Sequence, residues 1–199
     1  NVQETPHSIV ADSQNNFILM GVTGSNNFPT TTGAFQTTFM GGPLLVMNNF
    51  FTSGHLNGCD FFLSKFDPNG VMLQSTFMGG DSNDGLNYAD QLYFNYGDAF
   101  RGEVNVDQGD NIYVASVSRG NFPMINQGAQ QTYGGGDCDG IVFKMNSNLS
   151  ALMACTYLGG NGADAAYAIE FDQFGNLIIA EAKRWLHLNT GFNPSRFFH

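Results

Sequence analysis

The sequence predicts an all-β protein: a β-propeller-type repeat array of four-stranded antiparallel blades. Two observations lead to this prediction. The first is a pattern of short apolar strands and turns that recurs along the chain, which is the signature of a repeat architecture. The second is composition: 12% of residues are charged, 14% are aromatic and 25 are glycine. Such a profile is typical of short strands and tight turns rather than of amphipathic helices.

Three aspartates mark equivalent points of the repeat: Asp12, Asp107 and Asp172. The step from the first to the second is longer than the step to the third, and two insertions account for the difference. They span residues 43–57 and 86–101. A residue that recurs at one repeat position is first of all architectural, so the repeat has to be defined before any motif is interpreted.

Each copy is expected to hold four strands. One strand leads into each aspartate, a buried apolar strand follows it, and a hairpin completes the copy. Proline, asparagine and glycine in the hairpin loops favour tight turns. The predicted strands are residues 7–12, 104–107 and 168–172 before the aspartates; 17–22, 112–117 and 177–180 after them; and the hairpins 61–66 with 71–77 and 141–145 with 152–158.

The repeat region covers residues 1–180, and residues 181–199 form a divergent tail that lacks the strand pattern. The copies amount to about two and a half to three blades, with half a blade, His7 to Asp12, at the front. A closed propeller needs at least about four blades. We therefore expect the chain to be part of a larger propeller, or to need further blades or a partner to close its sheet edges.

The formal net charge of −10, from seven Lys+Arg against seventeen Asp+Glu, argues against binding of nucleic acid, because phosphate neutralisation needs basic residues. No apolar run approaches the roughly 20 residues that a transmembrane helix requires. The three cysteines form no Cys-x-x-Cys pair. Cys59 and Cys138 stand at equivalent repeat positions, and small buried thiols are favoured over a disulfide for all three, Cys155 included.

No catalytic motif is present in the sequence: Gly-x-Ser-x-Gly, His-Glu-x-x-His and the phosphate-binding loop are all missing. The histidines occupy unrelated repeat positions. Lys65 and Lys144 share one repeat position, and Asp60 and Asp139 share another. A recurring lysine near a recurring aspartate is expected to link neighbouring blades rather than to take part in catalysis. Because the sequence also lacks a catalytic motif, we predict no catalytic residues, no cofactor and no enzyme activity.

Two acidic loops are the candidate metal sites. Asp81 and Asn83 in one loop, and Asp137 and Asp139 in the other, place oxygen ligands at alternate positions before a glycine, as calcium-binding loops do. Neither loop has the downstream bidentate glutamate of a full calcium loop. The same sequences also form ordinary solvated turns, which is the interpretation we favour.

The two insertions are expected to be surface loops, and loops on a rigid scaffold are where binding tends to reside. Their aromatic residues Phe50, Phe51, Tyr93 and Tyr96 are the candidate binding residues for a protein or glycan. Aromatic residues this dense either pack on the blade or form a contact surface, and packing is favoured.

Several motifs in series resemble the bacterial β-propeller repeat labelled SBBP, which is common in secreted and surface proteins of Bacteroidetes. They are Asn26-Asn-Phe-Pro, Gly33-Ala-Phe-Gln, Asp60-x-Phe-x-x-Lys and Thr156-Tyr-Leu-Gly-Gly. The resemblance implies an extracellular or cell-surface setting and no chemistry. The expected function is a non-enzymatic module for protein interaction or adhesion. The alternatives are an accessory glycan-binding domain of a secreted hydrolase and a structural subunit of a bacterial secretion or motility apparatus.

Overall fold

The structure is a computed structural model that describes residues 4–47, 53–89, 92, 97–125 and 128–183. These residues form β-strands and, as their one helical element, the 3₁₀ turn η1 (Asp98–Phe100). The prediction of an all-β chain is confirmed. No helix in the described part of the chain has the length and apolar character needed to span a membrane.

The strands form two four-stranded antiparallel sheets and two hairpins. The first sheet has the order β1 (Glu4–Ala11), β2 (Phe17–Thr23), β5 (Asp60–Phe66), β6 (Met72–Met78). The second has the order β7 (Glu103–Val106), β8 (Ile112–Ser118), β9 (Asp139–Met145), β10 (Leu152–Leu158). The third sheet is the hairpin β11 (Asp164–Phe171) and β12 (Leu177–Lys183), and β3 (Leu45–Met47) pairs with β4 (Ser53–His55).

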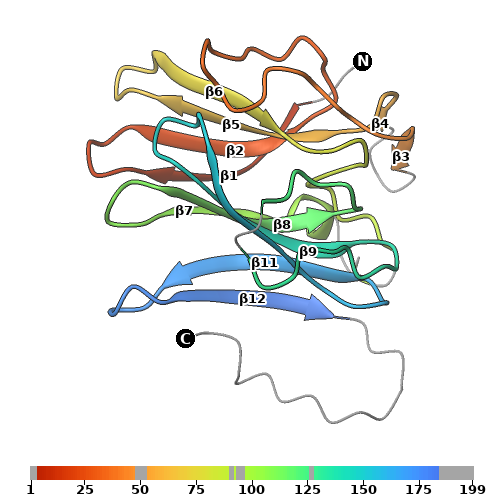
Figure 1. Cartoon of the computed structure of the whole chain (residues 1–199). Coiled ribbons are helices and arrows are strands. Elements are labelled where there is room, and N and C mark those ends of the chain that lie inside the picture. The colour runs from red at the N-terminus through yellow and green to blue at the C-terminus, as the bar shows by residue number, and fades with distance from the viewer. Residues whose placement is uncertain (1–3, 48–52, 90–91, 93–96, 126–127, 184–199) are drawn as a thin grey trace.

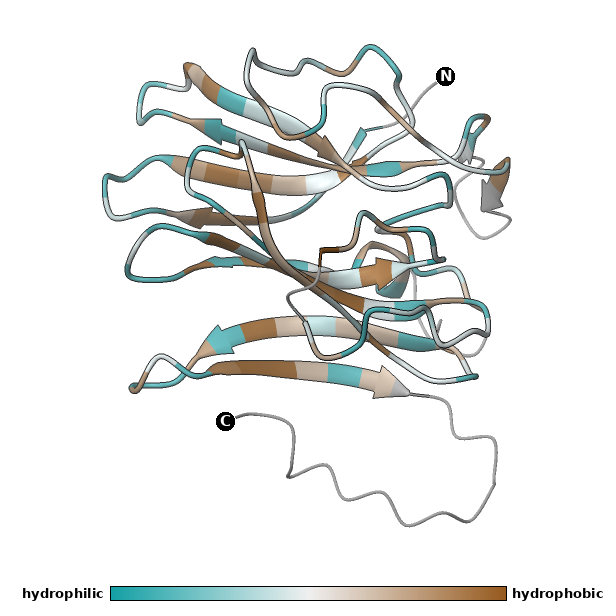
Figure 2. Ribbon diagram, in the orientation of Figure 1, coloured by the Kyte–Doolittle hydropathy of each residue, from teal (hydrophilic) through white to brown (hydrophobic). Residues whose placement is uncertain are grey.

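The three sheets lie one upon another, from the first at the top of Figure 1 to the hairpin β11–β12 at the bottom. Their first strands are neighbours, because β1 contacts β7 and β7 contacts β11. β11 also lies against β8 and β9. Figure 2 shows that apolar segments continue into β11 and β12 at the bottom of the array.

The expected half-blade at the front is wrong. Residues 7–12 belong to β1, which pairs with β2 from Glu4 to Ala11 and so opens a complete sheet. The strand before each aspartate is the first strand of its own sheet and not the last strand of the sheet before. The last predicted strand is also too short, since β12 continues past Ala180 to Lys183. Residues 184–199 of the predicted tail lie outside the described residues.

The largest core lies between the first and second sheets. Side chains alternate between the two faces of a strand, so β2 and β5 send one set toward β8 and β9. Between the second sheet and the hairpin lies a second core of smaller side chains. The main core includes Ile18, Met20, Phe61, Leu63, Ile112, Val114, Ile141 and Phe143; the second contains Ala115, Val142, Ala166 and Ile169. A strand covered on both sides needs apolar residues at successive positions, which explains its continuous apolar run.

The insertions are not simple surface loops, and that prediction is wrong for several of their described residues. Leu45 from the first insertion, and Leu86 and Ala99 from the second, belong to the main core. The favoured alternative for the aromatic residues, packing, holds for Tyr88 and Phe100, which pack against this core. Proline and aromatic content in a sequence does not reveal whether the intervening apolar residues reach the core.

The second insertion interrupts the first strand of the second sheet. Asp84 forms a bridge with Ser118 of β8, and the N–H of Gly85 donates to the carbonyl of Val117. The chain then leaves the sheet and returns as β7. In the third sheet the equivalent residue, Asp164, begins β11, which runs without interruption to Phe171.

Candidate functional site

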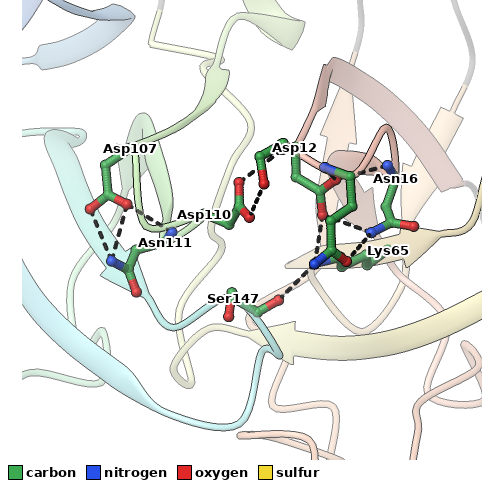
Figure 3. Close-up of polar contacts among 9 residues, drawn as sticks. Asp12, Asn16, Lys65, Asp107, Asp110, Asn111 and Ser147 are labelled. Carbon is green, nitrogen blue, oxygen red and sulfur yellow. Dashed lines mark hydrogen bonds and ion pairs between the residues drawn. The ribbon is translucent and has the colours of Figure 1, made fainter.

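The aspartates that define the repeat each organise a tight turn. Oδ1 of Asp12 accepts the backbone N–H groups of Gln14 (2.9 Å) and Asn16 (2.8 Å). Asp107 and Asp172 hold the turns after them in the same way. Figure 3 shows the first two turns facing each other. They are joined because Ser13 donates its N–H and Oγ–H to the carboxylate of Asp110, at 2.9 and 2.6 Å.

The recurring lysines pair with these aspartates. Lys65 Nζ lies 2.8 Å from Asp12 Oδ2, and Lys144 Nζ lies 3.1 Å from Asp107 Oδ2. Burial alone would raise the pKa of Asp12, but hydrogen bonds from Lys65 and from Asn16 hold it at about 2. Lys65 also donates to the carbonyl of Ser147 in the second sheet, at 3.2 Å (Figure 3). Lys65 therefore links the first sheet to the second, which is the kind of tie predicted for the recurring lysine.

Asp60 and Asp139, which the sequence placed near the lysines, have a different role. Each begins the third strand of its sheet and is fully buried. Asp60 accepts the N–H groups of Met40 (2.7 Å) and Gly41 (2.9 Å), and Asp139 accepts that of Gly134 (2.6 Å). Burial raises the pKa of Asp60 to about 6, against the opposing effect of these hydrogen bonds. The carboxylates fix the glycine-rich loops in place.

A second pair of buried aspartates holds the links between sheets. Asp84 accepts the N–H of Gly80 (2.9 Å), and Asp164 accepts that of Gly160 (2.7 Å). Burial raises the pKa of Asp84 well above its usual value. A side chain on Gly79 would collide with the carboxylates of Asp60 and Asp84, so the recurring Gly-Gly pair is required by close approach.

A glutamine holds the segment after each second strand against the outermost strand. Gln36 exchanges hydrogen bonds with Thr76 Oγ1 and accepts the N–H of Gly79 through Oε1. Gln130 makes the same bonds with Thr156 and Gly159. Gln36 therefore corresponds to Gln130. Matching Gly33-Ala-Phe-Gln to Gly-Ala-Gln-Gln by sequence would pair it with Gln131, one residue too late.

An open groove of about 430 Å³ lies at one end of the first two sheets, where these loops meet. Phe35 and Met40 supply exposed apolar surface there, with side chains 36% and 52% accessible. The lining also includes polar residues and turn residues: Gln36, Gly79, Gly80, Asp81, Asn121 and Pro123. A mixed lining of this kind suits a peptide or a sugar better than a purely apolar ligand.

A second groove, of about 170 Å³ and almost wholly apolar, lies on the face of β9 and β10 beside β12. Val142, Ala154 and Leu158 come from the second sheet, and Leu177 and Ile179 come from the third. Its lining also includes the polar residues Lys144 and Thr156. At this groove the third sheet no longer covers the face of the second sheet.

The calcium candidates do not gather into a site among the described residues, where no three His, Cys, Asp or Glu side chains are placed to hold a metal ion. Asp81 and Asp137 are exposed. Asn83 is buried and engaged: it accepts the N–H of Cys59 and donates to the carbonyl of Pro43 and to Tyr88 Oη. Calcium binding stays a prediction. Added Ca²⁺ should then raise the melting temperature, and D137A should abolish the shift.

The predicted binding residues Phe50, Phe51, Tyr93 and Tyr96 all lie outside the described residues. Elsewhere in the insertions the aromatic rings pack against the protein: the Arg119 guanidinium lies 3.4 Å from the centre of the Tyr88 ring, and Phe100 meets His7 edge to face. Both groove linings were missed by sequence reasoning. Their residues come from separate repeats, and the only signal was that Gln36 and Lys144 recur.

The three cysteines are free and buried, as predicted. No protein-family model matches this chain, and no curated protein does. The resemblance to the SBBP repeat therefore stays a prediction.

Proposed function

We propose that the chain is a segment of a β-propeller of SBBP-type repeats that serves as a non-enzymatic protein-interaction or adhesion module at the cell surface. The observation that carries the proposal is the regular stacking of repeated sheets with their first strands side by side. Both ends of the stack present apolar residues: Ile9 and Phe17 at the front, and Ile178 at the back, are 63%, 40% and 54% accessible. Further sheets would cover such faces.

The end groove is the proposed contact surface. It is formed by loops that the buried carboxylates of Asp60 and Asp84 hold rigidly, and rigidly held loops bind with little loss of conformational entropy. Met40 offers an apolar anchor, while Asp81 and Asn121 offer polar partners at the rim. The net charge of −10 disfavours polyanionic ligands and favours a neutral or basic protein surface.

The test is binding of the whole chain, immobilised on a sensor, to panels of extracellular-matrix proteins and of glycans. M40Q replaces the apolar anchor by a polar chain of similar length and should weaken binding of a protein partner about tenfold. V71Q is the matched control, because Val71 is exposed on the β5–β6 turn and does not line the groove.

Equal binding by wild type and M40Q would show that the groove is not the contact surface. Binding confined to glycans would favour the accessory glycan-binding alternative. Steady turnover of a hydrolase substrate by the purified chain would contradict the non-enzymatic assignment.

A further inference from the structure

The space that corresponds to the apolar groove beside β12 lies between the first and second sheets. In that interface the space is filled by side chains of the second sheet. Leu63, Thr76 and Met78 correspond to Val142, Thr156 and Leu158, as the pairing of β5 with β6 and of β9 with β10 shows. The first set is completely buried. In the second set Thr156 and Leu158 are only partly covered. The interface between the first and second sheets therefore shows which elements cover this face of a sheet when its residues are fully buried.

Two elements of the second sheet fill the equivalent space. The strand β9 pairs with β8 and places Ile141 and Phe143 against the first sheet. The turn between β9 and β10 then adds Leu149, whose side chain is fully buried. In the third sheet β12 has no strand beyond it among the described residues, so its outer edge and the groove lie together.

The same turn also supplies two carbonyl groups to the first sheet. Ser147 accepts from Lys65 Nζ (3.2 Å), and Leu149 accepts from the N–H of Phe35 (2.9 Å). The corresponding donors in the second sheet are Lys144 and Ala129, and both line the groove. Within the described ranges, Lys144 contacts Asp107 and Tyr113, and the N–H of Ala129 has no acceptor.

We infer that this groove is the docking site of a β-hairpin of the same repeat, which supplies the two outer strands of the third sheet. Its first strand pairs along β12 and lays apolar side chains on Val142 and Leu158. Its turn offers one carbonyl to Lys144 Nζ and one to the N–H of Ala129. The inference rests on the propeller part of the proposed function and names the partner that completes it.

A β-strand that ends in a turn fits the edge of β12, the apolar lining of the groove and the donors at Lys144 and Ala129 together. The outer edge of β12 pairs with no other strand among the described residues, and a sheet edge is completed by an extended chain and not by a helix. The apolar lining requires side chains on one face of that strand. The donors at Lys144 and Ala129 stand at the end of the groove, where the carbonyls of a hairpin turn would lie.

The probe is a synthetic peptide with the sequence of residues 137–160, the outer hairpin of the second sheet. Mixed with the whole chain, it should slow hydrogen exchange of the β12 amides by about tenfold or more. The variant A154R places a long cationic side chain in the groove and should abolish that protection. M153R is the matched control, since Met153 is the preceding residue of β10, is 41% accessible and does not line the groove.

Unchanged exchange of the β12 amides in wild type would overturn the inference. Self-association of the chain that A154R abolishes and the peptide does not inhibit would also overturn it, because a second copy would then cover the groove by another surface. Faster exchange of β12 on removal of residues 184–199, with no added peptide, would instead identify that segment as the occupant. Exchange of the β8 and β9 amides separates the two proposals: if they are protected and the peptide does not bind, the stacked sheets stand and only the docking inference fails.

Discussion

The interface between the first and second sheets differs from that between the second and third, although the sheets follow one plan. In the first interface the Phe61 ring packs against Phe143 and Phe122, with ring centres 5.7 and 6.1 Å apart. Around Val142 in the second interface, the buried side chains are two alanines and Ile169, and the Tyr113 ring meets Phe171 edge to face. The first two strands of a sheet therefore cover only the inner half of their neighbour, while the outer hairpin of the second sheet adds the buried Phe143 ring to the first interface.

The lysine–aspartate ion pairs also differ in burial, and the pair at the first interface is the more buried. The side chains of Lys65 and Asp12 are 11% and 1% accessible, whereas those of Lys144 and Asp107 are 23% and 22% accessible. The two ion pairs have the same position in the repeat. Only the first is covered by a turn from the next sheet, so burial, and not the pair itself, decides how much each contributes.

Replacing the large side chains should give the largest difference between the interfaces. F143A removes a buried ring from the first interface and should lower the free energy of unfolding by about 3–5 kcal/mol. L177A in the second interface should cost about 1 kcal/mol, because Leu177 is only partly buried. Urea unfolding of both variants measures the difference, and equal losses would show that the two interfaces are equally well packed.

Replacing the lysines should give the next largest difference. K65M leaves the nearly inaccessible carboxylate of Asp12 without its cation and should cost about 2–4 kcal/mol. K144M should cost less than about 1 kcal/mol, since Asp107 remains in contact with solvent. If the hairpin peptide is added, the cost of K144M should rise, because Lys144 would then be covered as Lys65 is.

Asp60 and His7, both in the first sheet, should make stability depend on pH with opposite signs. The pKa of Asp60 is raised by burial to about 6, so its folded form holds the proton more tightly and stability falls as pH rises from about 4 to 6. The pKa of His7 is lowered by burial to about 4, so stability falls as pH drops from about 6.5 to 4.

The two effects cancel in part in the wild type, and variants separate them. D60N removes the first, so acidification from pH 6 to 4 should destabilise it more steeply than the wild type. H7Q removes the second and should be stabilised over the same window. Denaturant midpoints at pH 4, 5 and 6 check both, and parallel curves for all three proteins would rule out these titrations. Below pH 4 every variant should lose stability as Asp12 and Asp107, whose pKa values are about 2, take up protons.

A further effect is expected at the turn that closes the first interface. Leu149 has a φ of 55° and stands where the β5–β6 turn has Gly70, with a φ of 82°. A non-glycine residue in this region is strained by about 1 kcal/mol, which the buried side chain offsets. L149G should relieve the strain and lose the packing, for a net cost of about 1–2 kcal/mol by urea unfolding. A gain in stability would show that the leucine contributes little to the interface.

Sequence reasoning located the elements of this fold well where the apolar pattern was strong. The hairpin strand 152–158 was predicted with its observed bounds, and β2, β5 and β8 were predicted to within one residue at each end. Assignment of strands to sheets failed at residues 7–12, because periodicity tells where a strand is and not which neighbour it pairs with. The role of Asp60 was missed for a similar reason: its partner loop at Met40 and Gly41 is distant in sequence, and nothing local reveals the contact.

The candidate site was less accessible to prediction. Aromatic density indicated the insertions, yet the described grooves are formed by residues such as Ala154, Leu177 and Asn121, which carry no motif. A groove depends on which surfaces are left uncovered after packing. That information lies in the stacking of sheets, and only the incomplete count of repeats hinted at it.

The interruption of the first strand at Gly85 bears on how such a chain can acquire new segments. Asp84 and Gly85 pair with one end of β8, and Glu103 pairs with the same strand further along. The residues between them therefore leave the sheet and return to it along the same edge. The sheet does not need a change of register to accommodate them. A strand that tolerates a break of this kind is a point where a chain can carry additional residues without a change in how the sheet pairs.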